Sequence, residues 1–110
     1  NLDGTELLKL LYQSLRALLR PALPNRLVRR VFELKSMVIN GEYTQDPPVP
    51  VSDSCHYAWE YVICSPSESL YQFALKEEVL KEFESVVEKS RRYFVRHEFR
   101  SLEILETLTA

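Results

Sequence analysis

The sequence predicts a mostly α-helical protein, an antiparallel bundle of about four to five helices with a Pro-rich loop and at most a short strand or hairpin. First, 110 residues of which 45% are hydrophobic suffice for one globular domain, here residues 1–110. Second, only two glycines occur, too few for the many tight turns of an all-β sandwich or barrel. Third, long segments repeat apolar residues at the helical period.

Residues 5–20 are predicted to form the first helix, because apolar residues recur there in a broad stripe. Asp3 or Thr5 can cap the N-terminus of this helix, and Pro21 ends it. The stripe consists of Leu7, Leu8, Leu11, Tyr12, Leu15, Leu18 and Leu19.

Residues 25–40 are predicted to form a second helix, with Asn25 as its N-cap after Pro24 and Gly41 as its C′ residue. The short connection makes it an antiparallel neighbour of the first helix. On or near one side lie Leu27, Val28, Val31, Leu34, Lys35 and Val38. The other side carries mainly Arg26, Arg29, Arg30 and Glu33.

The middle of the chain is less periodic. Residues 42–54 contain three prolines and are predicted to be a partly polyproline-like loop. Residues 56–64 fit either a strand or a short helix, and we favour the helix, with Ser52 or Ser54 as its cap. Residues 70–75 alternate, which predicts a short strand or an extended connector.

Residues 77–97 show the clearest helical pattern, with acidic residues at the start and arginines near the end, as the helix dipole favours. A final helix is predicted over residues 99–108. The buried stripe of the long helix is predicted to consist of Val79, Leu80, Phe83, Val86, Val87, Ser90 and Phe94.

The sequence contains no recognisable catalytic or metal-binding motif. His56 adjoins Cys55, but neighbours in sequence seldom point at each other, and nothing around His97 resembles a catalytic motif. Cys55, Cys64 and His56 are poorly spaced for zinc, which usually takes four ligands in two knuckles. We therefore predict a protein that is not an enzyme and binds neither a metal nor a cofactor.

Charge is distributed unevenly along the chain. Residues 1–41 contain seven basic and three acidic side chains, whereas residues 42–75 contain five acids and no Lys or Arg. Such asymmetry indicates anionic partners, although solvated helix faces give similar counts. Arginines beside an apolar groove suit an acidic peptide, and a second arginine cluster suits phosphates. The aromatic residues Tyr57, Trp59, Tyr61, Tyr71 and Phe73 either stack on nucleobases or complete the core.

Three separated segments, in the same order, resemble parts of one known protein family. The segment RLVRRVFELKSMVINGEY at 26–43 is similar to a family helix in which an arginine precedes a Phe-Glu-Leu-Lys run and a Gly-Tyr-like ending. The segment at 63–83 resembles the family's Ser-Pro turn, short strand and following helix. The segment at 91–105 resembles the closing segment of the family, in which a tyrosine is followed by basic residues and then by a Lys/Arg-Ser-Leu run. Together they cover most of the chain, and the family that they resemble is the bacterial DNA repair protein family RecO.

The resemblance implies a recombination mediator of the RecFOR pathway that works with RecR and helps load recombinase onto strands coated by single-strand-binding protein. RecO-like proteins combine an N-terminal OB-fold with a C-terminal helical domain, and residues 1–110 correspond to the helical domain. We therefore expect a domain excised from a longer, cytoplasmic, nucleoid-associated protein, with reduced DNA annealing. Many members carry a four-cysteine zinc ribbon between the Gly-Tyr ending and the Ser-Pro turn. The corresponding residues of this chain, 42–64, contain no CxxC, so we expect that zinc site to be lost.

Two candidate surfaces follow. The acidic C-terminal tail of single-strand-binding protein is predicted to bind Arg20, Arg26, Arg29, Arg30 and Lys35. Single- or double-stranded DNA is predicted to bind Arg91, Arg92, Arg96 and Arg100. The alternative function is a structural interaction domain that docks RecR or an OB-fold without touching DNA. No membrane contact and no small-molecule substrate are expected.

Overall fold

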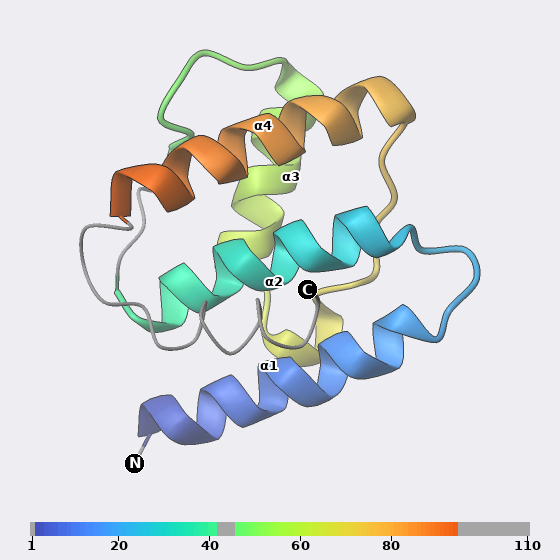
Figure 1. Cartoon of the computed structure of the whole chain (residues 1–110), viewed down its shortest axis with the longest axis vertical. Coiled ribbons are helices and arrows are strands. Elements are labelled where there is room, and N and C mark those ends of the chain that lie inside the picture. Colours follow the sequence, from blue (N-terminus) through green and yellow to red (C-terminus); the bar gives the residue numbers. More distant parts are fainter. Residues whose placement is uncertain (1, 42–45, 95–110) are drawn as a thin grey trace.

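The computed structural model describes residues 2–41 and 46–94, except for the side chains of residues 2, 3, 93 and 94 (Figure 1). These ranges contain four α-helices and one 3-10 turn, without a strand, which confirms the predicted mostly α class. The elements are α1 (Leu2–Leu18), α2 (Asn25–Ile39), α3 (Asp53–Cys64), η1 (Ser67–Ser69) and α4 (Glu77–Phe94). The helix predicted over 99–108 lies outside the described residues.

Helix α2 is the centre of the bundle, in contact with α1, α3 and α4. Figure 1 shows α1 and α2 running in opposite directions, as their short connection predicts, whereas α4 runs parallel to α2. Helix α3 crosses between α2 and α4. Within the described residues, no helix is long and apolar enough to cross a membrane.

The central position of α2 explains burial that the sequence pattern did not predict. Every residue from Val31 to Met37 is buried, because neighbouring helices cover more than one side of α2. Glu33, which the pattern placed on the solvent side, is only 1% exposed. That prediction was wrong, since helical periodicity reports the average polarity of a face and not the number of helices packed against it.

The helix ends follow the sequence closely except at the start of α1, which begins at Leu2, so neither Asp3 nor Thr5 is its N-cap. Gly41 adopts a φ of 75°, and its N–H donates to the carbonyl of Val38 at 3.0 Å, which confirms it as the C′ residue of α2. Asn25 is the first residue of α2 and not its cap, because Pro24 occupies the N-cap position, where no side chain caps the helix. Residues 56–64 are helical as favoured, and the side chain of Ser52 caps α3 by accepting from the N–H of Cys55 at 3.2 Å.

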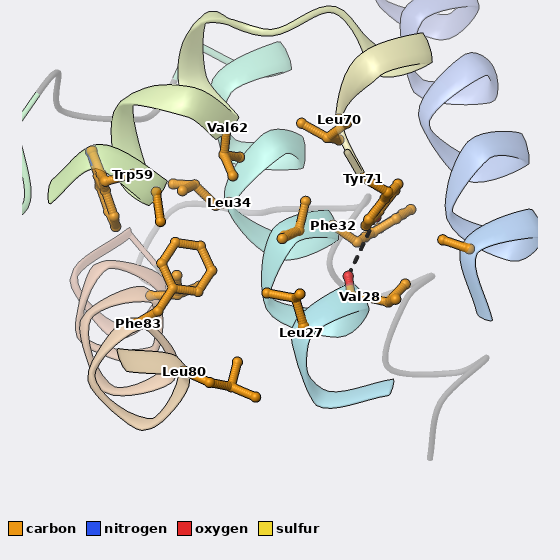
Figure 2. Packing of buried hydrophobic residues seen from close by; sticks show 14 of the residues in the cluster. Leu27, Val28, Phe32, Leu34, Trp59, Val62, Leu70, Tyr71, Leu80 and Phe83 are labelled. Atoms are coloured by element: carbon orange, nitrogen blue, oxygen red, sulfur yellow. Dashed lines mark hydrogen bonds between the residues drawn. The ribbon is translucent and has the colours of Figure 1, made fainter. Parts of the chain in front are cut away.

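The core lies on both sides of α2 (Figure 2). On one side Trp59 of α3 lies next to Phe83 of α4. On the other, the connector after η1 buries Tyr71, whose hydroxyl lies 2.6 Å from Ser14 Oγ and donates weakly to the carbonyl of Val28 at 3.4 Å. The connector alternative for 70–75 is therefore correct. The α4 stripe is confirmed for the buried residues Leu80, Phe83, Val86, Val87 and Ser90. Val79 is partly buried, and the side chain of Phe94 lies outside the described residues.

Candidate partner-binding site

Helix α1 buries its less hydrophobic side. Leu10, Ser14 and Ala17, spaced at i, i+4 and i+7, are buried. Two of these three are small, which lets the α1 backbone approach the core closely. At 100° per residue, a second set at i, i+4, i+7 and i+11 points in the opposite direction. This set, here called the outer stripe, consists of Leu8, Tyr12, Leu15 and Leu19.

The outer stripe is open to solvent, with 49% to 83% of each residue exposed. Leu18, 37% exposed, extends it along one edge. Together these side chains expose on the order of 500 Å² of mainly apolar surface, near the upper end of what single-chain soluble proteins show. Contiguous patches of this kind commonly mark interaction sites. Most of the apolar stripe that the sequence displays on the first helix therefore faces away from the core.

Basic side chains flank one edge of the outer stripe. The guanidinium of Arg16 lies 5.6 Å from the centre of the Tyr12 ring, a cation–π contact. Arg20 donates from Nη1 to the carbonyl of Tyr71 at 3.1 Å. Within the described ranges, no carboxylate lies within 4.0 Å of either guanidinium, so both retain positive charge without a neutralising partner. A groove of about 260 Å³ beside them is lined by Gln13, Arg16, Ala17, Arg20, Ser67, Glu68, Tyr71 and Gln72.

Two of the predicted arginines on α2 are instead paired with acids of the fold itself. Arg26 contacts both Glu77 and Glu84 of α4. Arg30 Nη1 lies 2.9 Å from Glu33 and 2.8 Å from Glu88. A ligand carboxylate that bound there would have to displace these pairs, which lowers the affinity available at this surface.

The remaining two predicted residues of α2 also differ from each other. Arg29 is partly exposed, and its Nε lies 4.0 Å from Glu33, a loose pair. Lys35 is buried, and its Nζ donates to the carbonyls of Ile63 and Ser65 at 3.2 and 2.7 Å. These carbonyls lie at the C-terminal end of α3, where a cation satisfies both the unpaired acceptors and the helix dipole. Burial lowers the pKa of Lys35.

The structure therefore does not bring the five residues predicted for peptide binding to one surface. Arg20 lies beside the outer stripe of α1, Arg29 is partly free on α2, and Arg26, Arg30 and Lys35 hold helices together. The sequence carried one signal of the alternative site, because leucines and Tyr12 recur on the face opposite Leu10. Periodicity alone grouped these residues with Leu7 and Leu11 in one broad apolar stripe and did not distinguish its exposed part from its buried part.

The arginines predicted to bind DNA are described only in part. Arg91 lies 3.4 Å from Glu33 and 3.6 Å from Glu88. Arg92 is also paired with Glu88, at 3.2 Å, but its side chain is 78% exposed. Arg96 and Arg100 lie outside the described residues, so the structure places only half of this predicted cluster.

The two cysteines occupy different environments. Cys55 is buried, and this burial raises the pKa of its thiol to about 11, which keeps it protonated at neutral pH. Cys64 is exposed at the end of α3. The ring of His56 lies beside carboxylates, with Nε2 3.4 Å from Asp46 and Nδ1 3.6 Å from Glu60.

Comparisons with protein-family models, curated proteins and solved structures give no match to this chain. The resemblance to the RecO family therefore stays a prediction that depends on the three segments quoted above. The site on α1 is defined by its own geometry and charge, independently of that resemblance.

Proposed function

We propose that this chain is a non-enzymatic binding domain of the RecO type, which takes part in DNA repair and recombination by holding partner proteins on the outer face of α1. The observation that supports this proposal is the outer stripe, an exposed apolar surface beside two guanidiniums that no described carboxylate neutralises. A large apolar surface that remains in water is unfavourable, and a partner that buries it gains that free energy.

The composition of this surface favours one kind of partner, an acidic segment that ends in apolar residues. Apolar side chains of the segment would cover Leu15 and Leu19, and its carboxylates would accept charge-assisted hydrogen bonds from Arg16 and Arg20. The C-terminal tail of single-strand-binding protein has this chemistry. We therefore move the proposed tail site from the arginines of α2 to α1.

A fluorescence-anisotropy titration with a labelled acidic tail peptide tests this placement. The double substitution Arg16→Ala and Arg20→Ala is expected to weaken binding at least about tenfold, because each lost charge-assisted hydrogen bond contributes about 1.5 kcal/mol or more. Leu15→Ser is expected to weaken binding as well, since it removes apolar area from the middle of the outer stripe.

Arg29→Ala is the matched control, since it removes a partly exposed guanidinium from the predicted α2 surface. A loss of binding in Arg29→Ala without a loss in the α1 variants would return the site to α2. No binding of the peptide at low salt would remove tail docking altogether. If purified RecR then binds and Leu15→Ser abolishes that binding, the alternative of a structural docking domain would hold.

Direct DNA contact is a second proposed activity, favoured by the high exposure of Arg92. Single-stranded oligonucleotide affinity, measured over a salt series, is expected to fall linearly on a log–log plot, because phosphate contacts release counterions. Arg92→Ala should make the slope of this plot shallower by about 0.7, the contribution of one phosphate contact with a single strand. A flat salt response would exclude this end of α4 as a phosphate contact, and with it the proposed nucleoid association.

A further inference from the structure

A second cluster of polar side chains lies far along the sequence from α1, where the Pro-rich segment meets α3. One donor atom from each of Asp46, His56 and Glu60 lies within 4.8 Å of the other two. His56 and Glu60 share a face of α3 at i and i+4, whereas Asp46 approaches from the preceding segment. Two separate segments of the chain therefore converge on one imidazole.

Each ring nitrogen of His56 has a carboxylate beside it. Neutral histidine carries a hydrogen on one ring nitrogen and a lone pair on the other. One carboxylate can therefore accept the N–H hydrogen, while the other lies beside the lone pair that a transition metal uses as its ligand atom.

The distances between these atoms fit a metal ion. The separation of 3.4 Å between Nε2 and the Asp46 carboxylate is longer than a normal N–H···O hydrogen bond. Zinc binds imidazole nitrogen and carboxylate oxygen at about 2.1 Å each in a tetrahedral arrangement, which places neighbouring ligand atoms about 3.4 Å apart. A zinc ion between ring nitrogen and carboxylate would therefore need little movement of either side chain.

The fold and the local charge also favour a bound cation. Pro47, Pro48 and Pro50 restrict the segment that carries Asp46, and this segment is fixed to α4 where Ser52 donates its backbone N–H to Glu82 at 3.0 Å. Less conformational entropy is then lost when Asp46 becomes a ligand. Residues 42–75 contain five acids and no Lys or Arg, so this stretch of chain is net negative.

We propose that Asp46, His56 and Glu60 form a binding site for a divalent transition metal, of which zinc is the representative ion. His56 ligates through Nε2 together with the Asp46 carboxylate, and water fills the remaining positions. Glu60, whose carboxylate lies 3.6 Å from Nδ1, moves closer to accept the Nδ1 hydrogen. It thereby fixes the tautomer that exposes the Nε2 lone pair, as carboxylates do behind many metal-bound histidines. Bound metal then joins the Pro-rich segment to α3. This site uses none of the cysteines and lies apart from the outer stripe.

Zinc titration of the full chain, by calorimetry in metal-free buffer, tests the proposal. One saturable zinc per chain is expected, together with a rise in the melting temperature as zinc is added. His56→Ala and Asp46→Asn should abolish saturable binding, whereas Glu60→Gln should weaken it about tenfold, the effect of losing an outer carboxylate. Magnesium should not bind, because it prefers all-oxygen ligands.

Cys64→Ser and His97→Gln are the matched controls, since they remove the exposed thiol and the other histidine. Both should bind zinc as the parent chain does. Zinc binding that is lost in Cys64→Ser and kept in His56→Ala would overturn the assignment. An absence of saturable binding up to about millimolar zinc would also overturn it.

Discussion

Glu33→Gln is expected to destabilise the domain by about 3 kcal/mol, the lower end of what the loss of one partner from a buried ion pair costs. Glu33 is 1% exposed, and the guanidiniums of Arg30 and Arg91 lie 2.9 and 3.4 Å from its carboxylate oxygens. Glutamine keeps the shape of the side chain and removes the charge. Arg30 and Arg91, each less than one-fifth exposed, would then lose a shared counter-charge in a position that water reaches poorly.

The buried network joins α2 to α4, so its loss should be visible in global unfolding. Burial raises the pKa of Glu33, and the neighbouring guanidiniums oppose this shift by favouring the carboxylate. Urea denaturation at pH 7, followed by circular dichroism, measures the free energy of unfolding.

The control for this network is Glu84→Gln, which removes a counter-charge of Arg26 on a half-exposed pair and should cost clearly less. An equal cost for the two variants would show that Glu33 does not act as a buried anion. Replacing Glu33, Arg30 and Arg91 together by apolar residues should recover most of the loss, because the buried charges are then gone and Glu88 keeps Arg92 as its partner.

Trp59→Ala is expected to cost about 3–5 kcal/mol, as large-to-small changes of buried aromatic residues do. Trp59 is fully buried where α3 meets Phe83 of α4 (Figure 2). Alanine would leave a cavity that helices anchored at both ends fill only partly. Because single domains of this size are stable by about 5–15 kcal/mol, the variant should be close to unfolding in mild denaturant.

The matched control for Trp59 is Tyr57→Ala on the same helix, since Tyr57 is exposed. That change should shift the free energy of unfolding by no more than about 0.5 kcal/mol. Circular dichroism is the suitable probe, because Trp59 is the only tryptophan and its removal eliminates the fluorescence signal. Equal urea concentrations at the midpoint of unfolding for the two variants would contradict the position assigned to Trp59 in the core.

Local features of the chain could be read from the sequence because they depend on neighbouring residues. The apolar period located the helices, and the breaks at Pro21 and Gly41 limited the first two of them. Ser52 was one of two cap candidates, and the distinction required the position of the Cys55 N–H. Capping and glycine conformation act within about one helical turn, so sequence alone carries most of this information.

Charge partners could not be predicted in the same way, because they depend on which helices meet. Arg26 and Arg30 had the spacing of a free basic face, yet both pair with carboxylates of α4, more than 50 residues later, in addition to the local pair of Arg30 with Glu33. Lys35 was grouped with these arginines as a peptide-binding residue, but its Nζ donates to the carbonyl of Ser65 at the end of α3. The trio of Asp46, His56 and Glu60 was invisible for the same reason, since only the path of the Pro-rich segment brings Asp46 to α3.

The sequence by itself determined that this protein is mostly helical and, to within a few residues, where three of its four described helices lie. Only the tertiary structure decided which face of each helix is buried. Helix α2 has neighbours on several sides and therefore buries even Glu33, whereas α1 meets the bundle on one side and leaves Leu8, Tyr12, Leu15 and Leu19 in water. Periodicity shows that a face is apolar, and packing decides whether the chain itself covers that face.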